Sequence, residues 1–279
     1  MIHTIITDLD GTLLDKQQRI SILNQQTLQK AIDAKLNVIF ATGRRLRATL
    51  KLAEYFHGNI TIISNNGQAT SYFPHNLMQS SEYFEPSQIE FVVNVMQKKK
   101  LLPIFHVNFF LQGIDLVASR ECQDPVYLSY LSKKEENIAY KDPLQIQDTV
   151  ENVLIICYLC SSYKKLEQIQ LECKAMASAA KLKTVLTRIP GVGPCLEFLP
   201  SNISKWSAIE KFLLQNKLPQ KGTISFGDEL NDMEMIQNAE IGVAMNNADS
   251  RLKKEANIIS QFSNQESAVA KELLRLKIL

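Results

Sequence analysis

The sequence predicts an α/β fold in which a doubly wound parallel sheet is interrupted by an inserted α+β domain. Strand-like and helix-like segments alternate before residue 82 and again after residue 189, which is typical of parallel βαβ units. Between these points, neighbouring strands and two main helices replace the alternation. The 279 residues also exceed what one hydrophobic core usually supports. We therefore expect a core domain formed by 1–81 and 190–279, with residues 82–189 inserted in it.

The first segment of the core opens with a β-branched run that predicts a buried strand at 2–7. Ser21 can cap the helix that follows, because apolar residues recur at helical spacing from Ile22 to Ile32. A second strand is expected at 38–41, a helix at 45–56 and a third strand at 60–63. That third strand ends in Ser64-Asn65-Asn66-Gly67, which is a turn signal and also suits a polar loop that faces a ligand.

The elements after residue 82 follow the same reasoning. We expect a helix at 87–99, strands at 103–110 and 113–118, a short helix, a strand at 153–160, a helix at 163–179, and strands at 182–188 and 195–199. Alternation then resumes with a helix at 205–216, strands at 222–226 and 241–244 around a helix ending near 238, a helix at 250–255, a strand at 257–259 and a helix at 265–276. The outer segments thus form one α/β domain.

Composition narrows the class of protein. A net charge of +2, with 45% hydrophobic and 22% charged residues, is ordinary for a soluble globular protein. Lysine clusters such as Lys98-Lys99-Lys100 are short and isolated, so no nucleic-acid surface is expected. No membrane span or signal peptide is expected, and five cysteines without framework spacing argue against an oxidised scaffold. We expect a cytoplasmic monomer or homodimer.

Two carboxylates stand at the end of the first strand. Asp8 and Asp10 are two residues apart, so the period of a strand directs both side chains the same way. Gly11 allows a sharp turn after them, and Thr12 can hydrogen-bond locally. An Asp-rich turn is the structural alternative. Because two crowded like charges need a cation or a proton, the pattern favours a functional site.

Polar residues also follow the other predicted strands of the core. Thr42 comes after the second strand, and Asp228 and Asp232 come after the strand at 222–226. Ligands of open parallel sheets bind beyond the carboxyl ends of the strands, so these side chains are expected to converge with Asp8 and Asp10. Magnesium suits such an oxygen-rich site. Zinc fits less well, because no His or Cys lies near these strand ends.

This set of residues suits phosphoryl chemistry. A carboxylate can attack phosphorus and form an aspartyl-phosphate. The reaction needs a metal, an acid/base group for the leaving alcohol and the attacking water, and groups that bind the phosphoryl oxygens. Asp8, Asp10, Thr42 and Lys205 can fill these places. Taken alone, Thr42 has the alternative of a helix-start turn, and Lys205 that of a solvated first-turn residue.

Four ordered motifs resemble those of the haloacid dehalogenase superfamily. They are Asp8-Leu9-Asp10-Gly11-Thr12, Ala41-Thr42-Gly43-Arg44, Ser204-Lys205, and Gly227-Asp228-Glu229-Leu230-Asn231-Asp232. With the long insertion between the second and third motifs, the chain is similar to the Cof-type phosphatases, which have a Rossmann-like core and a large α/β cap. The sequence departs from that pattern at Trp206, where these phosphatases usually have glycine.

The resemblance implies a role for each motif residue. Asp8 would be the nucleophile, and Asp10 the general acid/base whose carbonyl also meets a Mg²⁺ cofactor. Thr42 would hold the phosphoryl group, and Lys205 would neutralise it and steady Asp8. Asp228 would ligate the metal, together with Asp8 and Asp10.

Other positions complete the implied site. Asp232 would ligate the metal directly or support its ligands, and Asn231 would orient neighbouring groups. Leu9, Gly43, Asn66 and Asn231 would contact substrate or phosphate. Arg44 is open between a structural salt bridge and a role in the site.

The function expected from this site is Mg²⁺-dependent hydrolysis of a small phosphorylated metabolite, such as a sugar phosphate or a phosphorylated cofactor. A phosphomutase or phosphotransferase with the same intermediate is one alternative. A phospho-accepting regulatory module without turnover is another. Retention of Asp10 argues against the regulatory module, since a mere acceptor needs no acid for a leaving group.

Overall fold

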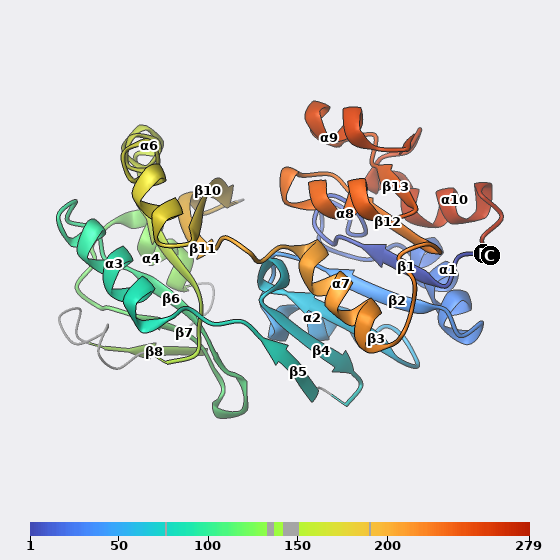
Figure 1. Ribbon diagram of the computed structural model, residues 1–279, viewed down its shortest axis with the longest axis horizontal. Coiled ribbons are helices and arrows are strands. Elements are labelled where there is room, and N and C mark those ends of the chain that lie inside the picture. Colours follow the sequence, from blue (N-terminus) through green and yellow to red (C-terminus); the bar gives the residue numbers. More distant parts are fainter. Residues whose placement is uncertain (76, 133–136, 142–150, 190) are drawn as a thin grey trace. The chain divides into compact units, whose positions relative to one another are not determined.

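The computed structural model describes residues 1–75, 77–132, 137–141, 151–189 and 191–279, and Figure 1 shows its elements. The chain divides into two compact units, one formed by Met1–Ser81 with Ile203–Leu279 and the other by Glu82–Asn202. The predicted end of the insertion at residue 189 is wrong. Strand β11 (Gly193–Pro200) pairs with β10 (Leu182–Ile189) and β9 (Val153–Leu159), so it belongs to the second unit.

The first unit is built on a sheet whose described strands run in the order β14-β13-β12-β1-β2-β3-β4-β5. The pairs from β14 to β3 are parallel, whereas β4 and β5 extend the sheet in antiparallel pairing. Strand β1 lies between β12 and β2, so segments from both ends of the sequence meet at the centre of the sheet. The bounds are β1 (Thr4–Thr7), β2 (Asn37–Ala41), β3 (Ile60–Ser64), β4 (Ala69–Phe73), β5 (Leu77–Ser81), β12 (Thr223–Gly227), β13 (Ile241–Ala244) and β14 (Ile258–Ile259).

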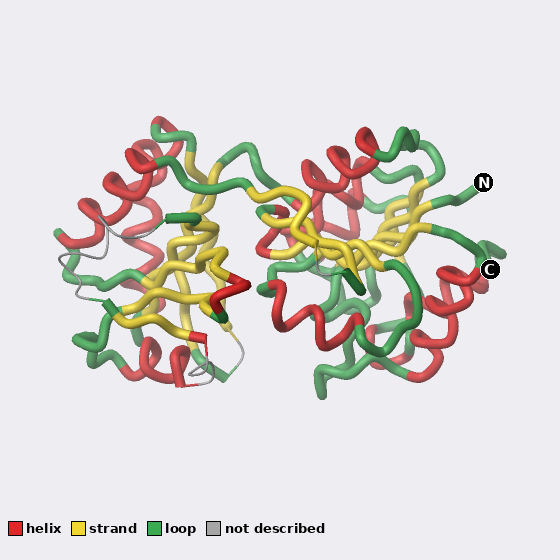
Figure 2. Tube along the Cα trace, turned by 90° about the horizontal axis from the view of Figure 1, so that it is seen from below, coloured by secondary structure: helices red, strands yellow, loops and turns green. Residues whose placement is uncertain are grey.

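Helices cover both faces of this sheet, as Figure 2 shows beside the labelled termini. Because strand side chains alternate, Ile6 and Ile39 lie on one face, where they pack with Trp206 and Ile209 of α7. Trp206 is therefore a core residue. On α1 and α10, which contact each other, the Asn24 side-chain oxygen accepts from the backbone N–H of Ala270 at 3.0 Å. The bounds are α1 (Ile22–Asp33), α2 (Leu46–Ala53), α7 (Lys205–Gln215), α8 (Met233–Asn238), α9 (Ser250–Glu255) and α10 (Ala268–Arg275).

The second unit has its own sheet, with described strands in the order β10-β11-β9-β6-β7-β8. All pairs are antiparallel except β7 with β8. Helices α3 and α6 bury one face of the sheet, and α4 buries the other. The remaining bounds are α3 (Pro86–Gln97), α4 (Pro125–Ser132), α6 (Tyr163–Ala179), β6 (Ile104–Phe109), β7 (Ile114–Ala118) and β8 (Ile138–Tyr140).

The predicted fold class is confirmed, since a mostly parallel α/β sheet is combined with an inserted α+β unit. Ser21 caps α1 as expected, with its side chain accepting from the backbone N–H of Asn24. Strands β4, β5 and β8 were not predicted. Among the described residues, no helix is both long and apolar enough to cross a membrane.

Candidate active site

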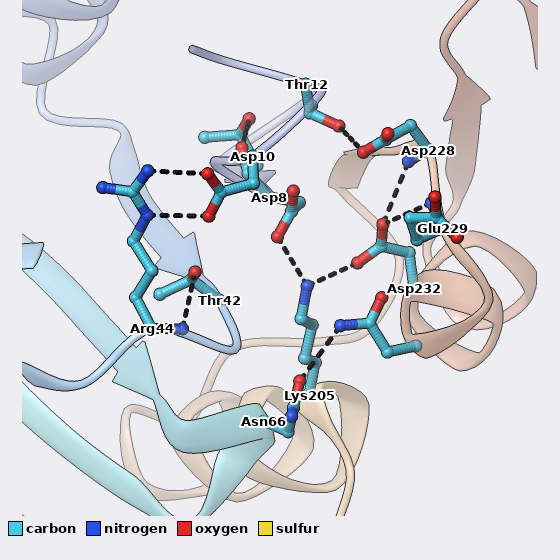
Figure 3. A network of polar contacts seen from close by, with 12 residues as sticks. Asp8, Asp10, Thr12, Thr42, Arg44, Asn66, Lys205, Asp228, Glu229 and Asp232 are labelled. Carbon is cyan, nitrogen blue, oxygen red and sulfur yellow. Dashed lines mark hydrogen bonds and ion pairs between the residues drawn. The ribbon is translucent and has the colours of Figure 1, made fainter. Parts of the chain in front are cut away.

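Two carboxylates meet where neighbouring parallel strands end. Asp8 directly follows β1, and Asp228 directly follows β12. Thr7 and Phe226 are register partners, and the backbone N–H of Asp8 donates to the Phe226 carbonyl at 3.0 Å. Because parallel strands end at the same edge, this register places the two aspartates side by side, as Figure 3 shows. Asp8 and Asp228 are both buried.

Lys205 provides the positive charge of this cluster. It is the first residue of α7 and follows the N-cap residue Ser204, whose side chain accepts from the backbone N–H of Ser207. The Lys205 side chain is only 1% exposed, and its Nζ donates to Asp8 Oδ1 and Asp232 Oδ1, both at 2.6 Å. A buried ammonium is costly unless it is paired in this way. The helix start therefore fixes the counter-ion of Asp8.

Hydrogen bonds orient the other two carboxylates, those of Asp228 and Asp232 (Figure 3). Thr12 Oγ1 donates to Asp228 Oδ1 at 2.8 Å. Asp232 Oδ2 accepts from the backbone N–H groups of Asp228 at 2.9 Å and Glu229 at 3.1 Å. Both oxygens of Asp232 thus have partners, one of which is Lys205. These contacts favour the alternative in which Asp232 supports the cluster.

The electrostatics of the cluster are unbalanced. Burial raises the pKa of the Asp8 carboxyl well above its ordinary value, Lys205 opposes this shift, and Asp232 and Asp228 reinforce it. Burial, followed by the charge of Asp232, raises the pKa of Asp228 to about 7. Burial alone would lower the pKa of Lys205, but Asp232 and Asp8 raise it above its ordinary value. Three neighbouring carboxylates therefore share one ammonium among the described residues. Protons or a cation must offset the remaining negative charge.

The donor set of this cluster suits a divalent cation. One carboxylate oxygen from each of Asp8, Asp228 and Asp232 lies within 4.8 Å of the other two. All three donors are hard oxygens, which Mg²⁺ prefers over the nitrogen and sulfur ligands of zinc. The raised pKa values of Asp8 and Asp228 are consistent with this, because a cation would stabilise their charged forms.

Asp10 lies apart from the buried carboxylates and is held by Arg44. Arg44 Nε donates to Asp10 Oδ2 at 2.7 Å, and Arg44 Nη2 donates to Asp10 Oδ1 at 2.6 Å. Arg44 also donates to the side-chain oxygen of Gln18. The side chain of Asp10 is 50% exposed. The sequence left Arg44 open between a salt bridge and a site role, and the structure pairs it with the predicted acid/base residue.

Predicted phosphate-binding residues from three segments gather at the loop after β2. Thr42 is buried, and its Oγ1 accepts from the backbone N–H of Arg44 at 3.1 Å. The backbone N–H of Asn66 donates to the Thr42 carbonyl at 3.0 Å, and the Asn66 side chain lies against Gly43. Asn231 Nδ2 donates to Asn66 Oδ1 at 3.0 Å. These four positions therefore lie close together in the first unit.

Other contacts of the site were missed by the sequence analysis or differ from it. Thr12 was expected to bond locally, but it reaches Asp228, which is remote in sequence. Asn247 Nδ2 donates to the Gly11 carbonyl at 2.8 Å and lies 3.5 Å from Asp228 Oδ2. The sequence feature that could have identified Asn247 is its position just after β13, since the other site residues also follow strands. Leu9 is buried, and its carbonyl accepts from the backbone N–H of Leu14 at 2.8 Å.

The fold and the cluster together define a class of protein. They are those of an α/β enzyme that gathers carboxylates and a lysine beyond the ends of parallel strands. A sequence profile described as haloacid dehalogenase-like hydrolase matches residues 5–273. The chain therefore belongs to the haloacid dehalogenase-like hydrolases, and the predicted resemblance is confirmed.

Relatives and solved structures agree with this assignment. The chain is 24% identical over 272 residues to the 5-amino-6-(5-phospho-D-ribitylamino)uracil phosphatase of Bacillus subtilis, covering 98% of this chain and 94% of the relative. It is also 24% identical over 286 residues to a Bacillus subtilis protein named as a phosphatase, covering 95% and 96%. A haloacid dehalogenase-like hydrolase from Bacteroides thetaiotaomicron has the same fold, with a TM-score of 0.80 and 24% identity over 99% of this chain and all of that chain.

Proposed function

We propose that this protein is a Mg²⁺-dependent phosphatase that acts on a small phosphorylated metabolite through an aspartyl-phosphate at Asp8. The observation that carries the proposal is the buried Asp8 carboxylate, held by Lys205 Nζ at 2.6 Å where β1 ends. A carboxylate at this place can act as a nucleophile, and the ammonium beside it can offset the charge of an incoming phosphoryl group. The names of the relatives support the same activity.

In the first step, an Asp8 oxygen forms a bond to phosphorus while the bond from phosphorus to the ester oxygen breaks. Asp10 gives its proton to the departing alcohol as general acid. Both Asp10 oxygens accept from Arg44 in the structure, so the acid form requires one of these contacts to open and that oxygen to carry the proton toward the leaving group. Thr42 and Lys205 would bind the phosphoryl oxygens.

In the second step, Asp10 takes a proton from water, whose oxygen bonds to phosphorus as the bond to Asp8 breaks. Inorganic phosphate leaves, and both aspartates return to their starting forms. Asp8, Asp228 and the Asp10 carbonyl would hold Mg²⁺, with Asp232 orienting Lys205 and the backbone after β12. When bound, the metal supplies positive charge that offsets the carboxylates and the phosphoryl oxygens.

The test is phosphate release from p-nitrophenyl phosphate and from a panel of phosphorylated metabolites. The panel includes sugar phosphates and 5-amino-6-(5-phospho-D-ribitylamino)uracil, on which one relative is named as acting. We expect turnover with Mg²⁺, its loss with a chelator, and a fall of at least about 1,000-fold in Asp8→Asn. The control is Asp33→Asn, which changes an exposed aspartate at the end of α1.

Other results point to the alternatives. Phosphate release that persists in Asp8→Asn contradicts the proposed nucleophile. Transfer to an added alcohol or sugar phosphate in preference to water identifies a phosphotransferase or phosphomutase. A stable phosphoenzyme with no release identifies a phospho-accepting module.

A further inference from the structure

The turn after β3 has an unusual backbone. Asn65, Asn66 and Gly67 all have positive φ angles, of 51°, 56° and 104°. Residues with a Cβ rarely adopt this left-handed conformation, although asparagine tolerates it better than most. Such strain persists only where surrounding contacts require it. The contacts of this turn lead to three separate parts of the candidate site.

The first set of contacts fixes the loop after β2. The backbone N–H of Asn65 donates to the Arg44 carbonyl at 2.9 Å, and that of Asn66 donates to the Thr42 carbonyl at 3.0 Å. An added Cβ on Gly43 would lie 3.2 Å from Asn66 Oδ1, so the Asn66 side chain rests on this loop. The turn thus sets the position of Thr42, the proposed phosphate-binding hydroxyl.

The second contact reaches the start of α7. A Cβ added to Gly67 would lie 2.1 Å from the Ser204 carbonyl oxygen and 3.2 Å from the Lys205 nitrogen. The turn therefore approaches the residue before Lys205 as closely as only glycine permits. This approach fixes where the α7 backbone begins, and hence where the Lys205 ammonium extends toward Asp8.

The third contact reaches the loop after β12. Asn231 Nδ2 donates to Asn66 Oδ1 at 3.0 Å, which Figure 3 shows as the dashed line at Asn66. Asn231 immediately precedes Asp232, which pairs with Lys205. A single side chain thus connects the turn to the segment that carries Asp228 and Asp232.

We propose that the Asn65–Gly67 turn is a positioning element that holds Thr42, Lys205 and Asp232 in register, with Asn66 acting as a positioning residue through Asn231. This inference rests on the proposed phosphatase function. It replaces the expectation that Asn66 contacts phosphate. Under the earlier expectation, the Asn66 side chain would donate from Nδ2 to a phosphoryl oxygen. In the positioning role, its Oδ1 accepts from Asn231.

The positioning role and the phosphate-binding role predict opposite orders of activity for two variants of Asn66. Asn66→Asp keeps an acceptor for Asn231 and a residue that tolerates positive φ, but it replaces the Nδ2 donor with negative charge. Asn66→Ala removes the acceptor. The positioning role predicts that Asn66→Ala lowers kcat for p-nitrophenyl phosphate about tenfold with KM within about twofold, while Asn66→Asp keeps at least about a third of kcat.

If the Asn66 side chain binds phosphate instead, the two variants should show the reverse order of activity. Asn66→Asp would then be the worse variant, with a raised KM, because its carboxylate would repel the phosphoryl group. That order overturns the inference. The matched control is Asn152→Ala in the second unit, because Asn152 has a similar φ of 54°. This control variant measures the cost of replacing an asparagine whose backbone is in the left-handed conformation. It should lower Tm without changing kcat.

A double variant tests the contact independently of turnover. If the Asn66–Asn231 bond couples the two loops, Asn66→Ala and Asn231→Ala together should lower Tm by less than the sum of the single shifts. Additive shifts overturn the inference even if the parent shows no phosphatase activity. A parent without turnover, combined with non-additive Tm shifts, contradicts the proposed function and leaves the positioning contact supported.

Discussion

The carboxyl of Asp228 links the site to the stability of the protein. Its pKa is raised from 3.8 to about 7 by burial and by the charge of Asp232. Between these values, the folded protein binds more protons than the unfolded chain. The contribution of the protonated Asp228 carboxyl to the free energy of unfolding is therefore fully present below about pH 4 and is lost as the pH rises through about 7.

We predict that Asp228→Asn raises Tm of the metal-free protein at pH 8 by about 3 °C, because a buried charge is replaced by a neutral isostere that still accepts from Thr12. The same variant should lose the increase in Tm that Mg²⁺ gives the parent. Differential scanning calorimetry with and without Mg²⁺ measures both effects.

The control for this prediction is a carboxyl whose pKa is shifted in the opposite direction. Hydrogen bonds from Arg251 lower the pKa of the partly buried Asp249 to about 2. Its contribution to the free energy of unfolding is therefore present above pH 4 and lost in acid. Asp249→Asn should therefore lower Tm slightly at pH 8. A lower Tm for Asp228→Asn at that pH would show that its ionised form is not the destabilising one.

The residues that the sequence identified share a local signal. Asp8, Asp10 and Asp228 each follow an apolar strand, and strand ends can be recognised from neighbouring residues. Their partners could not be found in this way. The contacts from Thr12 to Asp228 and from Asn231 to Asn66 span 216 and 165 positions, and only the folded sheet brings their ends together.

Helix α7 combines a catalytic candidate with a core residue. Lys205 extends to Asp8, whereas the next residue, Trp206, is 7% exposed and packs against Ile6 and Ile39. The large side chain is part of the cluster between α7 and the sheet. Packing of Trp206 therefore helps to fix the helix from which Lys205 extends.

We predict that Trp206→Ala lowers the free energy of unfolding by about 3–5 kcal/mol, because it leaves a cavity between α7 and the sheet. Leu214→Ala changes a residue of the same helix that is 73% exposed, and its effect should stay within about 0.5 kcal/mol. Urea denaturation of the two variants measures the difference. Equal effects would mean that Trp206 contributes little packing.

The strands that the sequence did not predict, β4, β5 and β8, have weak patterns of apolar residues. Strand β8 has only three residues, β5 (Leu77–Ser81) ends in three polar residues, and β4 (Ala69–Phe73) has Thr70 and Ser71 between its apolar residues. Strands β5 and β8 each lie at one end of a described sheet, and β4 joins β5 to β3. Such strands form by pairing with a neighbour, which single-segment patterns do not reveal.

The assignment of β11 shows the same limit at the domain boundary. Strand β11 was predicted as a strand, but the sequence placed the end of the insertion before it. Its pairing with β9 and β10 assigns it to the second unit. Which sheet a strand joins depends on contacts across the chain, so this boundary could not be found from composition.

At the scale of the whole molecule, the second unit is continuous in sequence and has cores on both faces of its sheet. We predict that a fragment of residues 82–202 folds alone and melts in one cooperative transition, as followed by circular dichroism. A fragment of residues 82–189 is the matched control. It lacks β11, which separates β9 from β10, and it should not melt cooperatively.

The central place of β1 also has a consequence for synthesis on the ribosome. Lys205 follows Asp8 by 197 positions, and β12, which pairs with β1, comes later still. A nascent chain that ends within residues 82–202 therefore carries Asp8 without its ammonium partner and leaves one edge of β1 unpaired. Because the second unit is translated in between, it can fold before the sheet of the first unit is complete. Translation order thus delays assembly of the site until the insertion has been made.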